Sequence, residues 1–312
     1  MTEAVTYYNE PLLKKPVWVW AVPTYFYVGA AAGASLALGA TAQLLNPGSQ
    51  ALVRRCRRIG LAGVTAGTGL LIYDLGKRSR FLNMLRVFRP TSPMNVGSWL
   101  LSATGSLAGL SVVAPGSIGN VAAIGAGVLG IPLSGYTGVL LSNTAVPVWQ
   151  EAGRSLPALF VASGMASAGA LFHLMDLPQA DEAITRRFAI AGQTAELAAM
   201  FALEREVSKV DRVSSPLKTG RSGFLWKTAK ALGAASLLLS LFSRKSPRIK
   251  TAAGVAGTAA ALSLRFALLQ AGRNSAVDAP ATIEQQRSRE LPQLQQQEQE
   301  PSPSGRGWPK AG

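Results

Sequence analysis

The sequence contains eight long apolar stretches, and segments richer in charged residues separate most of them. The stretches cover about residues 17–45, 58–76, 95–114, 118–142, 156–176, 187–204, 223–243 and 251–272. A helix needs about 20 mostly apolar residues to cross a bilayer, because each residue advances it by about 1.5 Å. The sequence therefore predicts an all-α, polytopic membrane protein with about eight transmembrane helices. An even number of crossings places both termini on the same side of the membrane.

The composition agrees with a membrane protein and excludes several kinds of chemistry. Charged residues make up 15% of the chain, against roughly 25% in an average soluble protein. There is one cysteine, Cys56, and one histidine, His173, so the chain alone can form neither a disulfide nor a bis-histidine haem site. The sequence has no Walker A, GxSxG or HExxH motif. We therefore expect this chain to bind no metal or haem of its own.

The net charge of +15 arises from basic residues that are interleaved between the apolar stretches. They form no continuous basic stripe, which argues against nucleic-acid binding and favours contact with anionic lipid headgroups. With eight crossings, 20 Lys and Arg residues fall on the side of the termini and ten on the other side. Because basic residues prefer the cytoplasmic side of a membrane, both termini are expected in the cytoplasm.

Three segments are expected along the chain. Residues 1–16 form a polar N-terminal segment, residues 17–272 form the transmembrane domain, and residues 273–312 form a tail. The tail is rich in Gln, Glu, Pro and Ser and poor in apolar residues, a composition typical of disordered segments.

Aromatic and polar residues gather on the membrane face that the termini share. Trp18 and Trp20 begin the first stretch, the loop at residues 74–99 follows the second, and Tyr136 and Asn143 lie near the end of the fourth. Tyr136 lies about six residues, or roughly 9 Å, inside its span, where a hydroxyl needs a hydrogen-bond partner. A quinone carbonyl or a carbonyl of a neighbouring helix could fill that role. Aromatic residues at span ends also serve as interfacial anchors.

The loop that follows the second stretch combines basic and apolar residues. Its arginines are Arg78, Arg80, Arg86 and Arg89, and its apolar residues include Phe81, Leu85 and Phe88. The arginines could face lipid headgroups. Their combination with apolar residues and two prolines favours a structured, amphipathic segment that docks a partner protein.

Ionisable residues inside the spans are a stronger functional signal, because a charge is costly at membrane depth. Glu196 lies near the middle of the sixth stretch and Arg265 near the middle of the eighth. These two residues could form a buried structural ion pair or belong to a proton path. Asp74 lies at a span end, where water can reach it. His173 and Asp176 are three residues apart and could share one helix face.

Several of these segments resemble the membrane subunit of the polysulfide reductase family, the NrfD-type quinone-interacting anchors. The similar segments are PVWVWAVPTYFYVGAAAGASL (16–36), IYDLGKRSRFLNMLRVFRPTSPMNVGSW (72–99), SGYTGVLLSNTAVPVWQE (134–151), LFVASGMASAGAL (159–171) and AGRNSAVDAPATI (271–283). The string RFLNMLRVFRPTSPMNVGSW is the most specific of them, because it is long and lies in the corresponding loop. The resemblance covers about residues 7–283.

This resemblance implies a subunit built from two four-helix bundles in the cytoplasmic (inner) membrane of a bacterium. Such a subunit binds no metal itself. It anchors a ferredoxin-type iron–sulfur subunit, which passes electrons to or from a molybdopterin-containing catalytic subunit. A quinone or quinol (menaquinone or ubiquinone) binds near the iron–sulfur partner.

The resemblance also assigns roles to residues. Tyr136 matches a family tyrosine at the quinone site, and Trp18-Val19-Trp20 matches the start of the first helix, where one branch has a histidine at the position of Val19. We expect the quinone to bind near Trp18, Trp20, Trp99, Tyr136 and Asn143, with Asp74 as the first candidate for proton exchange. Arg78, Arg80, Arg86 and Arg89 are expected to dock the partner.

Two other functions remain open at the level of the sequence. Val19 in place of histidine favours a membrane anchor without quinone chemistry of its own. Glu196 and Arg265 would suit a secondary transporter, although no clear pair of broken helices is visible in the two halves of the sequence.

Overall fold

All eight predicted stretches form helices. The computed structural model describes residues 13–77 and 79–286, and these residues contain no strand. The long helices are α1 (Ala21–Leu45), α2 (Gln50–Asp74), α4 (Pro93–Val113), α5 (Gly116–Ser142), α7 (Ser155–His173), α8 (Gln179–Val207), α10 (Gly220–Phe242) and α11 (Pro247–Ala276). Short helices join some of them: α3 (Ser79–Arg86), α6 (Pro147–Glu151), α9 (Asp211–Lys218) and the 3₁₀ turn η2 (Ser243–Lys245). The all-α prediction is confirmed.

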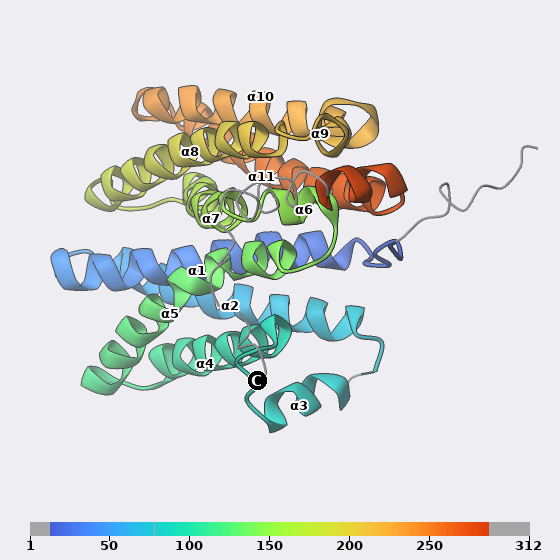
Figure 1. Ribbon diagram of the computed structural model, residues 1–312. Coiled ribbons are helices and arrows are strands. Elements are labelled where there is room, and N and C mark those ends of the chain that lie inside the picture. The colour runs from blue at the N-terminus through green and yellow to red at the C-terminus, as the bar shows by residue number, and fades with distance from the viewer. Residues whose placement is uncertain (1–12, 78, 287–312) are drawn as a thin grey trace, which may run out of the picture.

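The long helices pack as two four-helix bundles. Helices α1, α2, α4 and α5 form the first bundle, and α7, α8, α10 and α11 form the second. The two bundles lie one above the other in Figure 1. Helix α1 joins them, because it contacts α2 and α5 in its own bundle and α7 and α11 in the other. The end of the bundles that carries α3, α6 and α9 is called the N-terminal face, and the other end is called the opposite face.

Small residues let the helix backbones approach closely. A Cβ atom built on Gly33 of α1 would lie 2.4 Å from the carbonyl oxygen of Gly130 on α5. In the second bundle, a Cβ on Gly169 of α7 would lie 2.5 Å from the Cα of Ala189 on α8. Apolar burial cannot drive association between helices that already lie in lipid, so such close backbone packing supplies much of the attraction.

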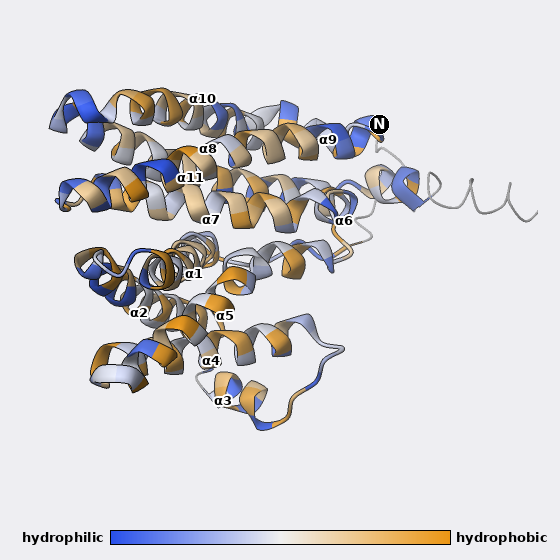
Figure 2. Ribbon diagram, turned by 90° about the vertical axis from the view of Figure 1, so that its left-hand side faces the viewer, coloured by the Kyte–Doolittle hydropathy of each residue, from blue (hydrophilic) through white to orange (hydrophobic). Residues whose placement is uncertain are grey.

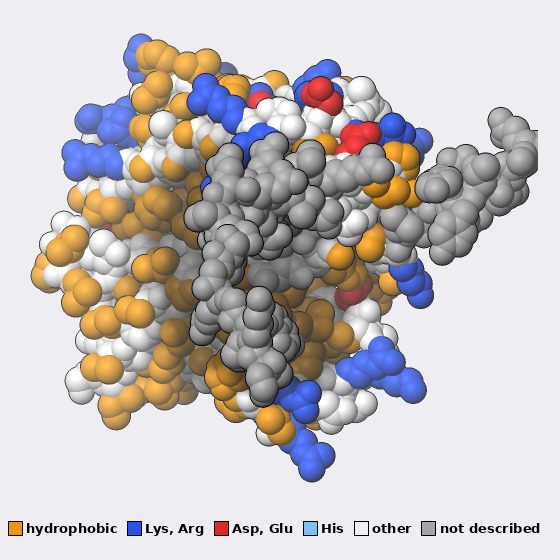
Figure 3. Space-filling view, viewed as in Figure 1, with side chains coloured by type: hydrophobic (Ala, Val, Ile, Leu, Met, Phe, Trp, Pro, Cys, Tyr) orange, Lys and Arg blue, Asp and Glu red, His pale blue; other side chains and the backbone are white. Residues whose placement is uncertain are grey.

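Five helices are long and apolar enough to cross a membrane by composition alone, namely α1, α4, α5, α7 and α11. Helices α2, α8 and α10 have 25, 29 and 23 residues, which is sufficient length, but they carry more charged residues. In Figure 2 strongly hydrophilic residues lie at helix ends, as on α10. Figure 3 likewise shows Lys and Arg side chains at both ends of the helices, with hydrophobic side chains between them. These features are those of a multi-pass membrane protein.

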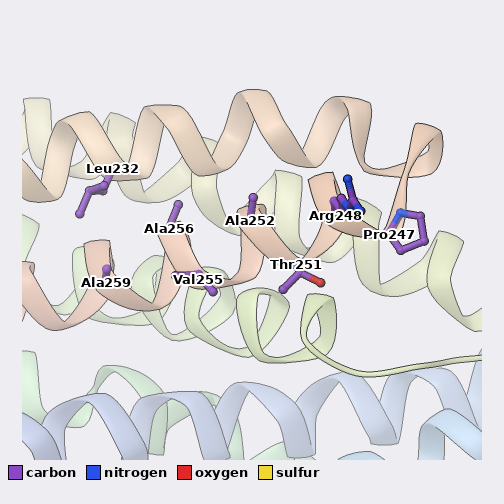
Figure 4. Close-up of a pocket in the computed structure, with 8 residues that line it drawn as sticks. All are labelled: Leu232, Pro247, Arg248, Thr251, Ala252, Val255, Ala256 and Ala259. Carbon is purple, nitrogen blue, oxygen red and sulfur yellow. The ribbon is translucent and has the colours of Figure 1, made fainter.

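The outer surface of the second bundle is also apolar along the helices and charged at a helix end. A groove of 670 Å³ lies along α10 and α11, and its walls include Leu232, Val255 and Ala259. Arg248 lies at one end of this groove, near the opposite face (Figure 4). An apolar wall that ends in a cation matches the change from lipid tails to lipid headgroups.

The packed part of the protein extends further along the chain than the sequence indicates. Helix α11 ends at Ala276, and residues 279–286 are also helical. Ala279 and Ala281 are buried, and the Gln285 amide donates to the Pro147 carbonyl over 3.2 Å. Residues 273–286 are therefore part of the packed structure, because a few alanines among polar residues suffice to pack on α6. The remainder of the predicted tail, 287–312, lies outside the described residues.

The close contact between α1 and α5 predicts that Gly33→Ala destabilises the protein. The new methyl group would meet the backbone of α5, which cannot move like a side chain, so we expect a loss of about 1–3 kcal/mol in the free energy of unfolding. Thermal unfolding in detergent measures this. Gly69→Ala on α2 is the matched control, because a Cβ there meets no atom within 4 Å. Equal stability of the two variants would contradict this packing.

Candidate functional site

Helix α3 is an amphipathic helix on the N-terminal face. Phe81 is buried, whereas Leu82 and the side chains of Arg80 and Arg86 are exposed. After α3 the chain exposes Val87, Phe88 and Arg89 as well. We call the exposed side chains of Arg80, Leu82, Arg86, Val87, Phe88 and Arg89 the α3 surface. The predicted docking residue Arg78 lies outside the described residues, whereas Arg80, Arg86 and Arg89 are brought to one surface.

Asn95 in the first turn of α4 holds this segment in place. Its side-chain amide donates to the carbonyls of Met84 and Val87, the latter over 3.0 Å, and its oxygen accepts from the Arg89 amide over 2.7 Å. Buried Asn95 thus satisfies three backbone groups of a segment that has little other regular structure. The shape of the α3 surface depends on this one side chain.

Trp18 faces inward at the N-terminal face and connects the two bundles. Its ring stacks on Trp149 with centroids 5.4 Å apart, and it meets Phe26 of α1 edge to face at 6.4 Å. Trp149 is fully buried and donates to the Leu268 carbonyl of α11 over 2.9 Å. Arg273 of α11 donates to the Trp18 carbonyl. Trp18 therefore has a packing role between the bundles.

Trp20 and Trp99 face outward, away from Trp18. Trp20 is 59% exposed and lies against Tyr73 at the end of α2, with ring centroids 6.2 Å apart. Trp99 is 38% exposed and meets Phe88 of the α3 surface edge to face at 6.1 Å. The predicted quinone-binding residues therefore occupy the same face but have different neighbours. Trp18 lies in the non-helical segment before α1, and Trp20 directly precedes the first residue of that helix.

Tyr136 lies inside the first bundle against α4. A Cβ on Gly97 would lie 2.2 Å from Tyr136 Cε1, so the ring occupies the space that the missing side chain leaves. Tyr136 also interacts with Tyr25 of α1. Its hydroxyl is shielded from solvent and interacts with the backbone of Gly97, but its proton has no acceptor within the described residues. Such an atom is expected to bind a water or a ligand, because a buried polar group without a partner is costly.

The other two predicted residues lie at helix ends on the N-terminal face. Asn143 caps the end of α5, is exposed, and donates its amide to the Val139 carbonyl over 2.8 Å. Asp74 is the last residue of α2 and is half-buried. Gly76 follows two residues later, and its positive φ of 69° turns the chain away from the helix axis. Asp74 therefore lies at the end of α2 on the N-terminal face.

Glu196 and Arg265 lie close together in the second bundle. Glu196 is 4% exposed and Arg265 is 0% exposed, and the two charges interact. No direct ion pair joins them among the described residues. Arg265 instead donates to the Ser163 hydroxyl of α7, and Ser163 also interacts with Glu196. The Arg265 guanidinium lies 4.8 Å from the centroid of the Phe160 ring, a cation–π contact that offsets part of its burial.

A family model described as polysulfide reductase matches residues 5–279. The chain belongs to the polysulfide reductase family. Its members are membrane subunits of polysulfide reductase-like complexes, so this chain is a membrane subunit with oxidoreductase partners. No curated protein is similar enough to count as a match.

Sequence reasoning missed two residues of this polysulfide reductase family member and suggested a different neighbour for a third, His173. Asn95 belongs to the string that carries the resemblance, but its spacing from Met84 and Val87 gives no signal of a hydrogen-bonded clamp. Ser163 looks like any small residue of a packed helix. His173 was paired with Asp176, yet α7 ends at His173 and its ring instead meets Ser240 Oγ at 3.1 Å.

The contacts of Asn95 predict that Asn95→Ala loosens the α3 surface without unfolding the bundles. The substitution removes three part-buried hydrogen bonds to the backbone, which together contribute about 1–3 kcal/mol. Amide hydrogen exchange across residues 79–92 should therefore accelerate. Asn83→Ala, on the exposed side of α3, is the control and should leave exchange unchanged. Unchanged exchange in Asn95→Ala would show that the clamp does not hold the segment.

Proposed function

We propose that this chain is the quinone-interacting anchor of a multi-subunit oxidoreductase in the bacterial cytoplasmic membrane. It exchanges electrons between the quinone/quinol pool and an iron–sulfur partner of ferredoxin type. That partner connects it to a molybdopterin catalytic subunit. Family membership supports the role of a membrane subunit, and the arrangement of the N-terminal face supports the finer assignment.

The partner docks on the α3 surface in this proposal. This surface combines exposed apolar side chains, Phe88 among them at 56% exposed, with three arginines. Aromatic residues and arginine are enriched at protein–protein interfaces, whereas a free surface rarely exposes so many apolar side chains in one short segment. The arginines favour a partner with an acidic surface.

The Tyr136 hydroxyl, whose proton has no acceptor within the described residues, carries the quinone assignment. It is shielded from solvent, lies near Tyr25, and belongs to the same bundle end as Asp74 and Trp99. A phenol hydroxyl can donate to a quinone carbonyl and accept from a quinol hydroxyl. Quinone reduction takes up two electrons and two protons. Electrons come from the docked partner, and Asp74 is the group at the membrane boundary that can exchange protons with water.

A second candidate function is an anchor without quinone chemistry. Val19 favours it, because this exposed apolar side chain stands where a branch of the family has histidine and can neither donate nor accept a proton. Extraction of the purified complex distinguishes the two functions. A stoichiometric quinone supports the first, and its absence together with full electron transfer inside the complex supports the second.

The quinone assignment predicts that Tyr136→Phe slows quinol-linked turnover while the complex stays assembled. Loss of one hydrogen bond to the bound quinone should reduce turnover by about tenfold, the effect of roughly 1.4 kcal/mol. Steady-state quinol kinetics of the purified complex measure this. Tyr73→Phe is the control, because it removes an exposed hydroxyl from the same face. Turnover equal to that of the unmodified protein would remove Tyr136 from the site.

The docking assignment predicts that Arg86→Glu combined with Arg89→Glu weakens retention of the partner. Reversed charges would repel an acidic surface, and such juxtapositions cost several kcal/mol. Retention on affinity purification of this chain measures the effect. Arg244→Glu with Arg248→Glu is the matched control, because these exposed arginines lie on the opposite face. Full retention in the first double variant would place the interface elsewhere.

A further inference from the structure

The core of the second bundle is polar over half its length. Polar side chains with at most 4% exposure line it from the opposite face to the middle: Ser163 and His173 on α7, Gln193 and Glu196 on α8, Ser236 and Ser240 on α10, and Arg265 on α11. The serines on α10 are four residues apart, and Gln193 and Glu196 are three apart, so each pair lies on one helix face. Four helices thus contribute to one polar interior.

Hydrogen bonds connect only parts of this interior. His173 Nε2 meets Ser240 Oγ at 3.1 Å near the opposite face. One turn deeper, the Gln193 amide donates to Ser236 Oγ over 2.7 Å, and Ser236 donates to the Ala253 carbonyl over 2.8 Å. Deeper still, Arg265 donates to Ser163.

Buried atoms without partners lie between these contacts. Among the described residues they are Gln193 Oε1, Glu196 Oε1, and Arg265 Nε and Nη2. Each such group costs about 1–3 kcal/mol or more if it stays unpaired, and charged groups cost more. Buried polar groups of this kind are usually satisfied by ordered water. The interior between His173 and Glu196 is therefore a place where water is stabilised.

This interior has an aqueous mouth on the opposite face. A polar pocket of 170 Å³ opens there, where α8 and α11 begin. His173, Glu182, Arg186 and Lys250 line it together with Ser243, and Lys250 forms an ion pair with Glu182. His173 therefore belongs both to the pocket and to the polar interior.

Beyond Glu196 the interior is closed by apolar side chains. Met200 and Leu203, one and two turns further along α8, are at most 1% exposed. They belong to the same hydrophobic cluster as Leu264, Leu268 and Trp226. Water and protons can enter such a densely packed apolar region only at a high cost. The polar interior is consequently open at one end.

We propose that the second bundle contains a water-filled half-channel that gives Glu196 access to protons from the opposite face alone. A proton enters at the pocket, moves along water past His173, Ser240 and Gln193, and binds the Glu196 carboxylate. It returns to water by the same route. Arg265 of α11 and the Ser163 hydroxyl of α7 face this carboxylate. Tyr27 of α1 interacts with Arg265. The half-channel requires neither a quinone nor a docked partner.

Cysteine accessibility tests whether the interior holds water. Ser240→Cys and Ser236→Cys are nearly isosteric, and hydrophilic thiol reagents react with hydrated thiolates. In the full chain reconstituted in oriented vesicles, both cysteines should react from the opposite face, at least ~100-fold faster than Ala229→Cys. Ala229 lies two turns from Ser236 on the same face of α10, within the apolar cluster. Native Cys56, fully buried, is an internal control. Rates equal to that of Ala229→Cys, or reaction from the N-terminal face, would overturn the half-channel.

Infrared spectroscopy tests the role of Glu196. Its protonated carbonyl band, identified by its loss in Glu196→Gln, should shift on transfer to deuterated water at acid pH. Gln193→Leu places an apolar side chain across the route and should slow this exchange by on the order of tenfold. Gln43→Leu, a substitution in the other bundle, should leave the exchange rate unchanged. A band that does not exchange, or equal rates in both variants, would show that the cluster is structural only.

Discussion

Close backbone contact between α1 and its neighbours is the constraint on which the architecture depends. Helices in lipid gain little from burying apolar side chains against one another, so they associate through small residues. Gly33 lets α1 lie directly against Gly130 of α5, and α1 also contacts α7 and α11 of the second bundle. Because α1 and α5 both pack against the second bundle, the aromatic contacts of Trp18 and Trp149 and the alignment of the N-terminal face follow from this packing.

The two bundles differ in what their interiors contain. The first bundle has tyrosines near its N-terminal face, where Asn95 also fixes the α3 surface, and this is the region that we assign to quinone and partner binding. The second bundle has a polar interior that reaches from the opposite face to Glu196. In this account the two regions face different sides of the membrane, with α1 between them through Tyr27. Any coupling of electron and proton movements would have to pass through α1 or through the contact of α5 with α7.

Much of the fold could be predicted from the sequence, and less of the site. Apolar length fixes the helices, because no other element satisfies the backbone within lipid. The mixture of basic and apolar residues after the second stretch favours a structured, amphipathic segment, and the structure has helix α3 there. The contacts between side chains could not be predicted in the same way. Trp18 turns inward and Trp20 outward, a difference that depends on where α1 begins. The sequence suggests a buried pair of Glu196 and Arg265, and the structure brings them close without a direct ion pair among the described residues. The position of Ser163 between them has no signal in the sequence, because serine is common in packed membrane helices. The order of residues 273–286 comes from packing on α6, which composition does not reveal.

The most direct test of the central claim is cross-linking mass spectrometry on the complex purified from native membranes in mild detergent. The iron and molybdenum contents of the same sample are measured as well. The account predicts an iron–sulfur subunit and a molybdopterin subunit, and cross-links that join the iron–sulfur subunit to residues 77–99. A metal-free single chain that stays intact in several detergents would contradict it, as would a partner cross-linked only to the opposite face.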